Sequence, residues 1–167
     1  SFDDGTNSPI VVSAVVNGDG SWSIFPVDIS GLNDGPITVS AVETDVAGNV
    51  GAPVTVGVVH DGQAPSSISI NTPIEGPDNT ANAQEDDSVE ISGSGAESTS
   101  TVQVTLSDGM TAPLSVAATV NPDGTWQIAP ADISAMNDGT ITVTVVETDA
   151  SGNVGAPVMT TFEHDKS

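Results

Sequence analysis

Residues 140–149 read TITVTVVETD, and this stretch decides the fold. Apolar residues alternate with threonines from Ile141 to Val145, which is the period-two pattern of a β-strand with one buried face. The same face continues to Glu147 and Asp149, so a line of core-facing positions ends in two carboxylates. The stretch therefore predicts a long strand whose last residues differ chemically from the rest of its buried face.

A related stretch, PITVSAVETD, occurs at residues 36–45, which lie 104 positions earlier. At this offset, 28 of the 45 residues in 17–61 are identical to their counterparts in 121–165. Self-similarity over this distance indicates a tandem repeat, and a unit of about 104 residues has the size of one small β-domain.

The repeat offset also predicts the domain organisation. Ser1 aligns with Thr105, which lies inside a predicted strand of the second copy. We therefore expect residues 1–61 to be the C-terminal part of a repeat, with its opening strands missing, and residues 62–167 to be a complete repeat.

The second copy consists of short apolar or β-branched stretches separated by turn residues, without useful helical periodicity. Their number matches the seven strands of an immunoglobulin-like sandwich, so the predicted fold class is all-β, with immunoglobulin-like β-sandwich repeats in tandem. The predicted strands are residues 67–70, 89–92, 101–106, 114–120, 125–128, 140–148 and 158–163.

Two local features support a packed core in this repeat. Trp126 directly follows a tight turn at residues 121–124 and is predicted to be a core aromatic residue. Asp132 is expected to cap a single helical turn, whose Ile133 and Met136 fill one end of the sandwich.

The sandwich topology sorts the loops onto two ends. The chain entry, the loop at residues 95–98, the turn at 121–124 and the loop after residue 149 are predicted to share one end. The loops at 78–87, near 108 and at 132–139 share the other end with the chain exit.

The charge balance excludes several classes of function. The chain has 23 acidic residues and a single lysine or arginine, Lys166, which gives a formal net charge of −22. Nucleic-acid binding and attraction to an anionic membrane both need basic side chains. The absence of cysteine excludes disulfides and thiolate metal sites. Hydrophobic residues make up 37% of the chain, which argues against an acidic disordered segment.

The sequence also gives no sign of a membrane-inserted segment. We find no apolar run near 18 residues and no secretory signal peptide at the N-terminus. We therefore expect no membrane insertion, and the ligand that such an acidic chain attracts is a cation.

The carboxylates at the end of the long strand need compensation if they are buried. Two unpaired carboxylates cost several kcal/mol in an apolar environment, and no arginine is available for Glu147 or Asp149. A divalent cation or full solvation at the sandwich tip remains, and Ca²⁺ best suits carboxylate, amide and carbonyl oxygens. Alternatively, both residues lie in water, with Asp149 accepting hydrogen bonds from its own turn.

Other acidic residues are predicted to gather at the two ends of the second copy. At the junction end, the candidate calcium ligands are Asp61, Glu97 and Asp149, together with Glu147 and main-chain oxygen near Asn153. At the opposite end, Asp78 and Glu85 lie in an acidic loop beside Asp165. A solvated loop and a second ion site are equally compatible with this second cluster.

Three motifs together resemble the bacterial Ig-like repeats of giant, type-I-secreted RTX or biofilm adhesins. They are the DGTW turn at 123–126, the DISAMNDG segment at 132–139 and the ETDASGN loop at 147–153. The resemblance implies tandem repeats at the surface of Gram-negative bacteria, stiffened by Ca²⁺ at their junctions, that extend a distal ligand-binding domain. It implies the junction ligands Asp61, Glu97 and Asp149, with Asp45 as the equivalent residue in the first copy.

Two other functions compete with this extracellular spacer. An enzyme is disfavoured because His60 and His164, the only histidines, occupy the same repeat position beside a strand exit. Glu147 and Asp149, around one turn, form no glycosidase cleft, so we expect no enzyme and no small-molecule substrate. A module that binds sugar, ice or peptide is the alternative, although two similar units argue against it. The spacer's expected partners are calcium and neighbouring repeats.

Overall fold

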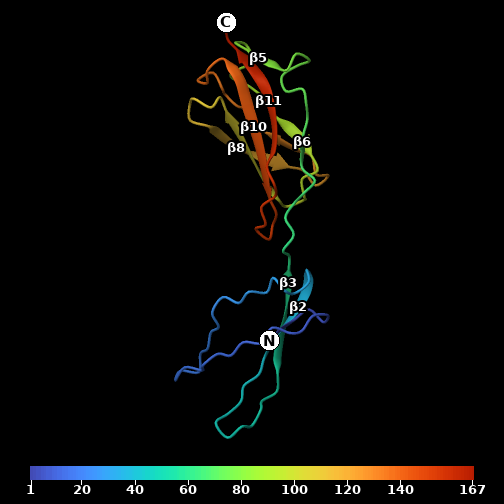
Figure 1. The fold of residues 1–167 in the computed structure, drawn as a ribbon, viewed down its shortest axis with the longest axis vertical. Coiled ribbons are helices and arrows are strands. Elements are labelled where there is room, and N and C mark those ends of the chain that lie inside the picture. Colours follow the sequence, from blue (N-terminus) through green and yellow to red (C-terminus); the bar gives the residue numbers. More distant parts are fainter. The chain divides into compact units, whose positions relative to one another are not determined.

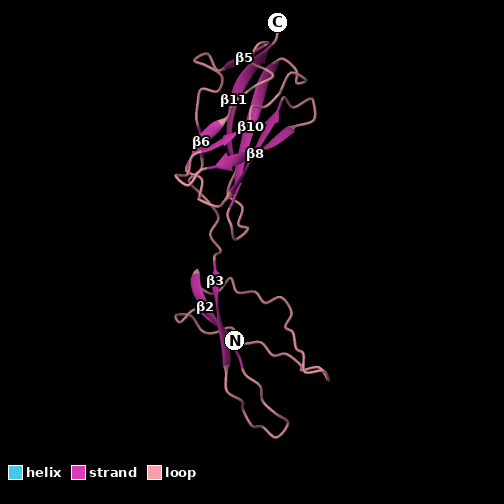
Figure 2. Ribbon diagram, turned by 180° about the vertical axis from the view of Figure 1, so that it is seen from behind, coloured by secondary structure: helices cyan, strands magenta, loops and turns pink.

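The computed structural model describes residues 1–167 and divides them into two compact units, Ser1–Gln63 (unit 1) and Ala64–Ser167 (unit 2). Strands and loops form both units, as the colouring in Figure 2 shows. No helix in the chain is long and apolar enough to cross a membrane.

Unit 1 has one small antiparallel sheet in the order β1–β2–β3. The strands are β1 (Phe2–Asp3), β2 (Gly35–Ala41) and β3 (Val54–His60). Leu32 and Ile37 are its only fully buried hydrophobic residues. This unit therefore has strands but almost no core.

Unit 2 contains eight strands, hydrogen-bonded in the order β4–β6–β9–β8–β7–β10–β11–β5. Figure 1 shows the long strands β10 and β11 side by side. They are β4 (Ser69–Ile70), β5 (Thr80–Asn82), β6 (Ser92–Ser94), β7 (Thr101–Ser107), β8 (Leu114–Val120), β9 (Trp126–Ile128), β10 (Gly139–Thr148) and β11 (Val158–Asp165). All pairs are antiparallel except β11 with β5.

The strand β8 belongs to both layers of the unit 2 sandwich. Residues 114–117 pair with β7, and residues 118–120 pair with β9. A strand that changes partners along its length turns the corner between two packed sheets. The hydrogen-bonded order is thus continuous, although the strands enclose one core.

The core confirms the face alternation predicted for residues 140–148. In β10, every second residue from Ile141 onward is buried. The largest buried side chains are Trp126 of β9 and Phe162, which pairs with Ile141 from the neighbouring strand β11, and each is 1% exposed. Ile133 and Met136 are also buried, as predicted, at the end of the sandwich.

Five of the seven predicted strands match within two residues at each end, and the remaining two are less regular. Residues 89–92 form an isolated bridge from Val89 to Ala131, followed by the short β6. The first strand shortens to β4, and β5 is an additional strand that the sequence pattern did not predict. The expected helical turn at Asp132 is a non-helical turn, in which the Met136 N–H donates to the Ile133 carbonyl over 2.8 Å.

Hydrogen bonds confirm how the loops sort onto the two ends. At one end, the Ala96 N–H donates to the carbonyl of Gly124, and the Gly155 N–H donates to the carbonyl of Glu147. At the other end, the Ile133 N–H donates to the carbonyl of Asp86 over 2.7 Å. The carboxylates discussed below therefore lie at two separate ends of unit 2.

Candidate metal centre

Glu147 is fully buried at the end of β10, with an exposed fraction of 0%. The regular alternation of the strand places it on the face of Val143 and Val145, and it lies opposite Val102 of β7. The fold therefore buries a carboxyl group on the face of β10 that otherwise carries apolar side chains.

The two carboxylate oxygens of Glu147 differ in their contacts. Oε1 accepts a hydrogen bond of 2.6 Å from the backbone N–H of Glu97. Oε2 is buried and has no hydrogen-bond partner, and the hydroxyl oxygen of Ser100 is also buried without a partner. An unsatisfied buried carboxylate oxygen is costly, because a single hydrogen bond does not replace the water that solvated it.

Asp149 continues this face and is 9% exposed. Its Oδ1 accepts the N–H groups of Ser151 and Asn153 at 2.8 Å each, and its Oδ2 accepts the side-chain amide of Asn153 at 2.8 Å. These bonds, with the side chain of Asn153 as the largest contribution, lower the pKa of Asp149 although burial opposes them. Asp149 thus accepts hydrogen bonds from its own turn, as the alternative predicted, but the alternative is wrong in placing both carboxylates in water, because Glu147 and Asp149 are buried.

Asp45 makes the same contacts in unit 1. It accepts the N–H groups of Ala47 and Asn49 and the side-chain amide of Asn49. Asp45 is exposed, however, and so is Glu43, the counterpart of Glu147. The turn is therefore local, whereas the burial of the carboxylate pair belongs to unit 2.

The structure brings only part of the predicted junction set together. Glu97 approaches Glu147 through its backbone N–H, and its own side chain is exposed. Asp61 belongs to unit 1, where its Oδ1 accepts the N–H of Gln63 at 3.2 Å. Its predicted convergence with Glu97 and Asp149 stays a prediction.

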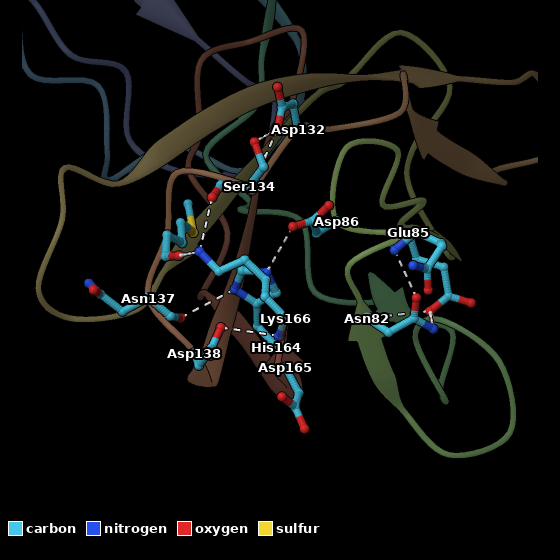
Figure 3. Close-up of polar contacts among 12 residues, drawn as sticks. Asn82, Glu85, Asp86, Asp132, Ser134, Asn137, Asp138, His164, Asp165 and Lys166 are labelled. Carbon is cyan, nitrogen blue, oxygen red and sulfur yellow. Dashed lines mark hydrogen bonds and ion pairs between the residues drawn. The ribbon is translucent and has the colours of Figure 1, made fainter.

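The second predicted cluster lies at the opposite end of unit 2 (Figure 3). Glu85 Oε2 accepts the backbone and side-chain N–H groups of Asn82, and Asp165 Oδ1 accepts two bonds from Ser167. The carbonyl of Asp78 accepts the hydroxyl of Thr80. In the whole chain, no three His, Asp or Glu side chains are close enough to form a metal-binding group.

A buried polar contact near this second cluster involves His164. The ring nitrogen Nδ1 is 3.2 Å from the carbonyl of Asn137, and Nε2 is 3.5 Å from Oδ2 of Asp86 (Figure 3). The ammonium group of Lys166 donates to the carbonyls of Ser134 and Met136. These contacts connect Asp86 and the segment 134–137 to the end of β11 and the residues that follow it.

Asp108 lies in the loop after β7, which was predicted to share this end of unit 2, and its carboxylate holds the local loop structure. Its Oδ1 accepts the N–H groups of Met110 and Thr111, and its Oδ2 accepts the N–H and side-chain amide of Asn137. The backbone bond from Asn137 is the largest of the contributions that hold the pKa of Asp108 well below its usual range. The same contact occurs in unit 1, where Asp4 accepts the N–H of Asn33. Asp4 and Asn33 are the repeat counterparts of Asp108 and Asn137, so the repeat offset could have identified this pair from the sequence.

The end of β10 offers carboxylate oxygens, which are the ligand type of hard cations. Glu147 supplies a buried oxygen without a partner, and Asp149 supplies a second carboxylate on the same face. Ca²⁺ binds carboxylate and carbonyl oxygens in flexible coordination, whereas softer metals prefer thiolate or imidazole.

Comparison with known proteins gives one family. A model of the bacterial Ig-like domain matches residues 67–166, while no curated protein sequence matches. The tetra-tandem repeat in the extending region of a large adhesion protein is 29% identical, with a TM-score of 0.52 over 98% of this chain and 40% of that chain. A Ca²⁺-stabilised adhesin that helps an Antarctic bacterium reach out and bind ice is 25% identical, with a TM-score of 0.45 over 91% and 36% of the two chains.

Proposed function

This chain belongs to the family of bacterial Ig-like domains, and from that premise we propose that it is a calcium-stabilised extender segment of a large bacterial surface adhesin. Bacterial Ig-like repeats of adhesins are structural modules and not enzymes. The related extending region supports the spacer role, in which tandem repeats project a distal binding domain from the cell. This chain spans 40% of that related chain. Its proposed partners are the neighbouring repeats.

The observation that carries the calcium part of the proposal is the unpartnered Oε2 of Glu147. A bound Ca²⁺ supplies the positive charge that the chain itself lacks at this end, since its one lysine donates to carbonyls at the other end. Glu147 and Asp149 are the proposed ligands within unit 2. Main-chain oxygen near Asn153 completes the proposed set.

A calcium titration of thermal unfolding tests this proposal. Ligand binding to the folded state stabilises it by about 1.4 kcal/mol when free calcium is ten times Kd. Extracellular modules bind Ca²⁺ with a Kd of roughly 10⁻⁴ to 10⁻³ M, so about 10 mM calcium is sufficient. We expect Tm to rise with calcium and to fall again when EGTA is added.

The variant Glu147→Gln separates this site from general charge screening. It keeps the shape of the side chain and removes its charge, so the calcium-dependent rise in Tm is expected to disappear. Glu43→Gln is the matched control, because Glu43 occupies the same repeat position but is exposed. An unchanged calcium response in Glu147→Gln contradicts the assignment of this residue.

The same titration separates a spacer from a ligand-binding module. A calcium-stabilised spacer gains stability from the ion alone, without sugar or peptide. A chain whose Tm and small-angle scattering profile do not change up to about 10 mM calcium, well above the expected Kd, is not a calcium-stabilised extender.

A further inference from the structure

The buried face of β7 begins with a serine whose hydroxyl has no hydrogen-bond partner. Ser100 directly precedes β7 and is 9% exposed. It alternates with Val102 and Val104, which are both buried, so its side chain lies on the same inward face. The hydroxyl oxygen of Ser100 is itself buried and accepts or donates no hydrogen bond. Because a buried hydroxyl without a partner is costly, this residue needs an explanation other than packing.

The strand register places Ser100 beside the carboxylates at the end of β10. Val102 of β7 pairs with Glu147, and the antiparallel ladder ends at the next pair. Its register, continued by one more position, sets Ser100 opposite Asp149 and diagonal to Glu147. Cβ atoms of directly opposite residues lie about 4.5–5.5 Å apart, and those of diagonal neighbours about 7–8 Å. Three buried side chains that carry oxygen therefore gather at this end of the sheet.

The turn that leads into Ser100 has a strained backbone. The Ser100 N–H donates to the carbonyl of Glu97 over 3.1 Å and closes a four-residue turn. The third residue of this turn, Thr99, has a φ of 78°, where glycine or asparagine is usual and a β-branched residue is an outlier. Such strain persists only where the surrounding structure holds the backbone, and it clusters at binding sites. The same turn donates the Glu97 N–H to Oε1 of Glu147, which leaves Oε2 as the unpartnered oxygen.

We propose that the hydroxyl oxygen of Ser100 is a ligand of the divalent cation at Glu147, an assignment that rests on the proposed calcium function. One cation then gives a partner to both buried oxygens that lack one, Oε2 of Glu147 and Oγ of Ser100. Ca²⁺ combines carboxylate oxygens with neutral oxygen ligands, and a hydroxyl oxygen has lone pairs to offer. The turn at residues 97–100 thus forms one side of the site.

The variant Ser100→Ala is expected to have opposite effects without and with calcium. In EDTA, the substitution removes a buried oxygen that has no partner, so Tm is expected to rise by about 4 °C. In calcium, the same substitution removes a ligand, so the Kd for Ca²⁺ is expected to increase at least about fivefold. A serine with a purely structural role would not strengthen the calcium-free fold and weaken calcium binding together.

The test measures both quantities on the full chain. Thermal unfolding in EDTA gives Tm, and titration of the ¹⁵N-labelled chain with calcium chloride gives Kd. The amide signal of Glu97 reports this site specifically, because its N–H donates to Glu147. Ser98→Ala is the matched control, since it makes the same substitution in the same turn at an exposed serine. This control is expected to keep the Tm and the Kd of the unsubstituted chain.

The outcomes separate the role of Ser100 from the calcium function itself. An unchanged Kd in Ser100→Ala overturns the assignment of Ser100 and leaves the calcium site at Glu147 in place. A Tm in EDTA that does not rise also overturns it, because the hydroxyl then has a partner in the calcium-free chain. If calcium does not shift the Glu97 signal of the unsubstituted chain, the proposed calcium function fails, and the assignment of Ser100 fails with it.

Discussion

Asp108 is one of many aspartates in this chain that accept backbone N–H groups within turns. Asp123, Asp132 and Asp149 each accept the N–H of the residue two positions later. Their counterparts in unit 1, Asp19, Asp28 and Asp45, make the same bond. Much of the net charge of −22 therefore serves local turn structure, and only the burial of Glu147 and Asp149 points to an ion.

The hydrogen bonds that the aspartate carboxylates accept predict that unit 2 loses stability in acid. Hydrogen bonds to the ionised form lower the pKa of Asp108, Asp123, Asp132, Asp149 and Asp165 below the ordinary value of 3.8. The unfolded chain then binds more protons than the folded chain below this value. The stabilisation that these hydrogen bonds give the folded state is complete above about pH 5 and is lost as the pH falls below 3.8. Urea unfolding of unit 2 from pH 6 to 2.5 measures this loss.

The variant Asp108→Asn isolates one residue in this acid response. Asparagine keeps an acceptor oxygen but does not titrate, so the decline of stability below pH 4 is expected to become shallower. Asp87→Asn is the control, because it makes the same substitution at an exposed aspartate of unit 2. Measurement in about 0.5 M sodium chloride suppresses the opposing gain from relieved charge repulsion. Equal acid profiles for all three chains would contradict the role of Asp108.

At the scale of strands, β6 depends on a glycine that leaves no space for a side chain. A Cβ at Gly93 would lie 1.9 Å from the carbonyl oxygen of Ser69 in β4 and 2.4 Å from Cζ2 of Trp126 in β9. Both neighbours are fixed, since Gly93 pairs with Ile70 on one side and with Trp126 on the other. The sheet position of Gly93 between β4 and β9 therefore tolerates only glycine.

Gly93→Ala is expected to destabilise unit 2 by about 3 kcal/mol or more, because overpacking forces the backbone of β4 or the Trp126 ring to move. Chemical unfolding followed by Trp126 emission measures this change. Gly57→Ala makes the same substitution in β3, where nothing lies within 4 Å of an added Cβ, and is expected to change stability by less than about 0.5 kcal/mol. A Gly93→Ala chain as stable as the Gly57→Ala chain would contradict the close packing of β4 and Trp126 around Gly93.

The sequence predicted the long strands well because their alternation and length are unambiguous. The strand β10 has a continuous period of two, and Trp126 marks the start of β9 directly after a turn. It missed β5, because three residues in an acidic loop carry no alternation and the partner, β11, is distant in sequence. The sequence pattern placed Glu147 on the core-facing side of β10. It did not predict the hydrogen bond from the Glu97 N–H, because that contact depends on the loop conformation.

At the scale of the whole molecule, two units with matching register differ in how much apolar surface they bury. The hydrophobic core cluster of the chain lies entirely within unit 2. Unit 1 keeps the β2–β3 pairing but exposes Trp22, Phe25 and Val58. A hydrogen-bonded ladder without a core opens easily, because backbone bonds alone contribute little net stability against conformational entropy.

Hydrogen exchange on the full chain measures this difference at matched positions. The amides of β2 that bond to β3 are expected to exchange at least about a hundredfold faster than the equivalent amides of β10 that bond to β11. Local sequence does not explain such a difference, because residues 36–45 and 140–149 are nearly the same and share one register. Equal protection in the two units would contradict this prediction, because it would mean that the β2–β3 ladder is stable without a packed core.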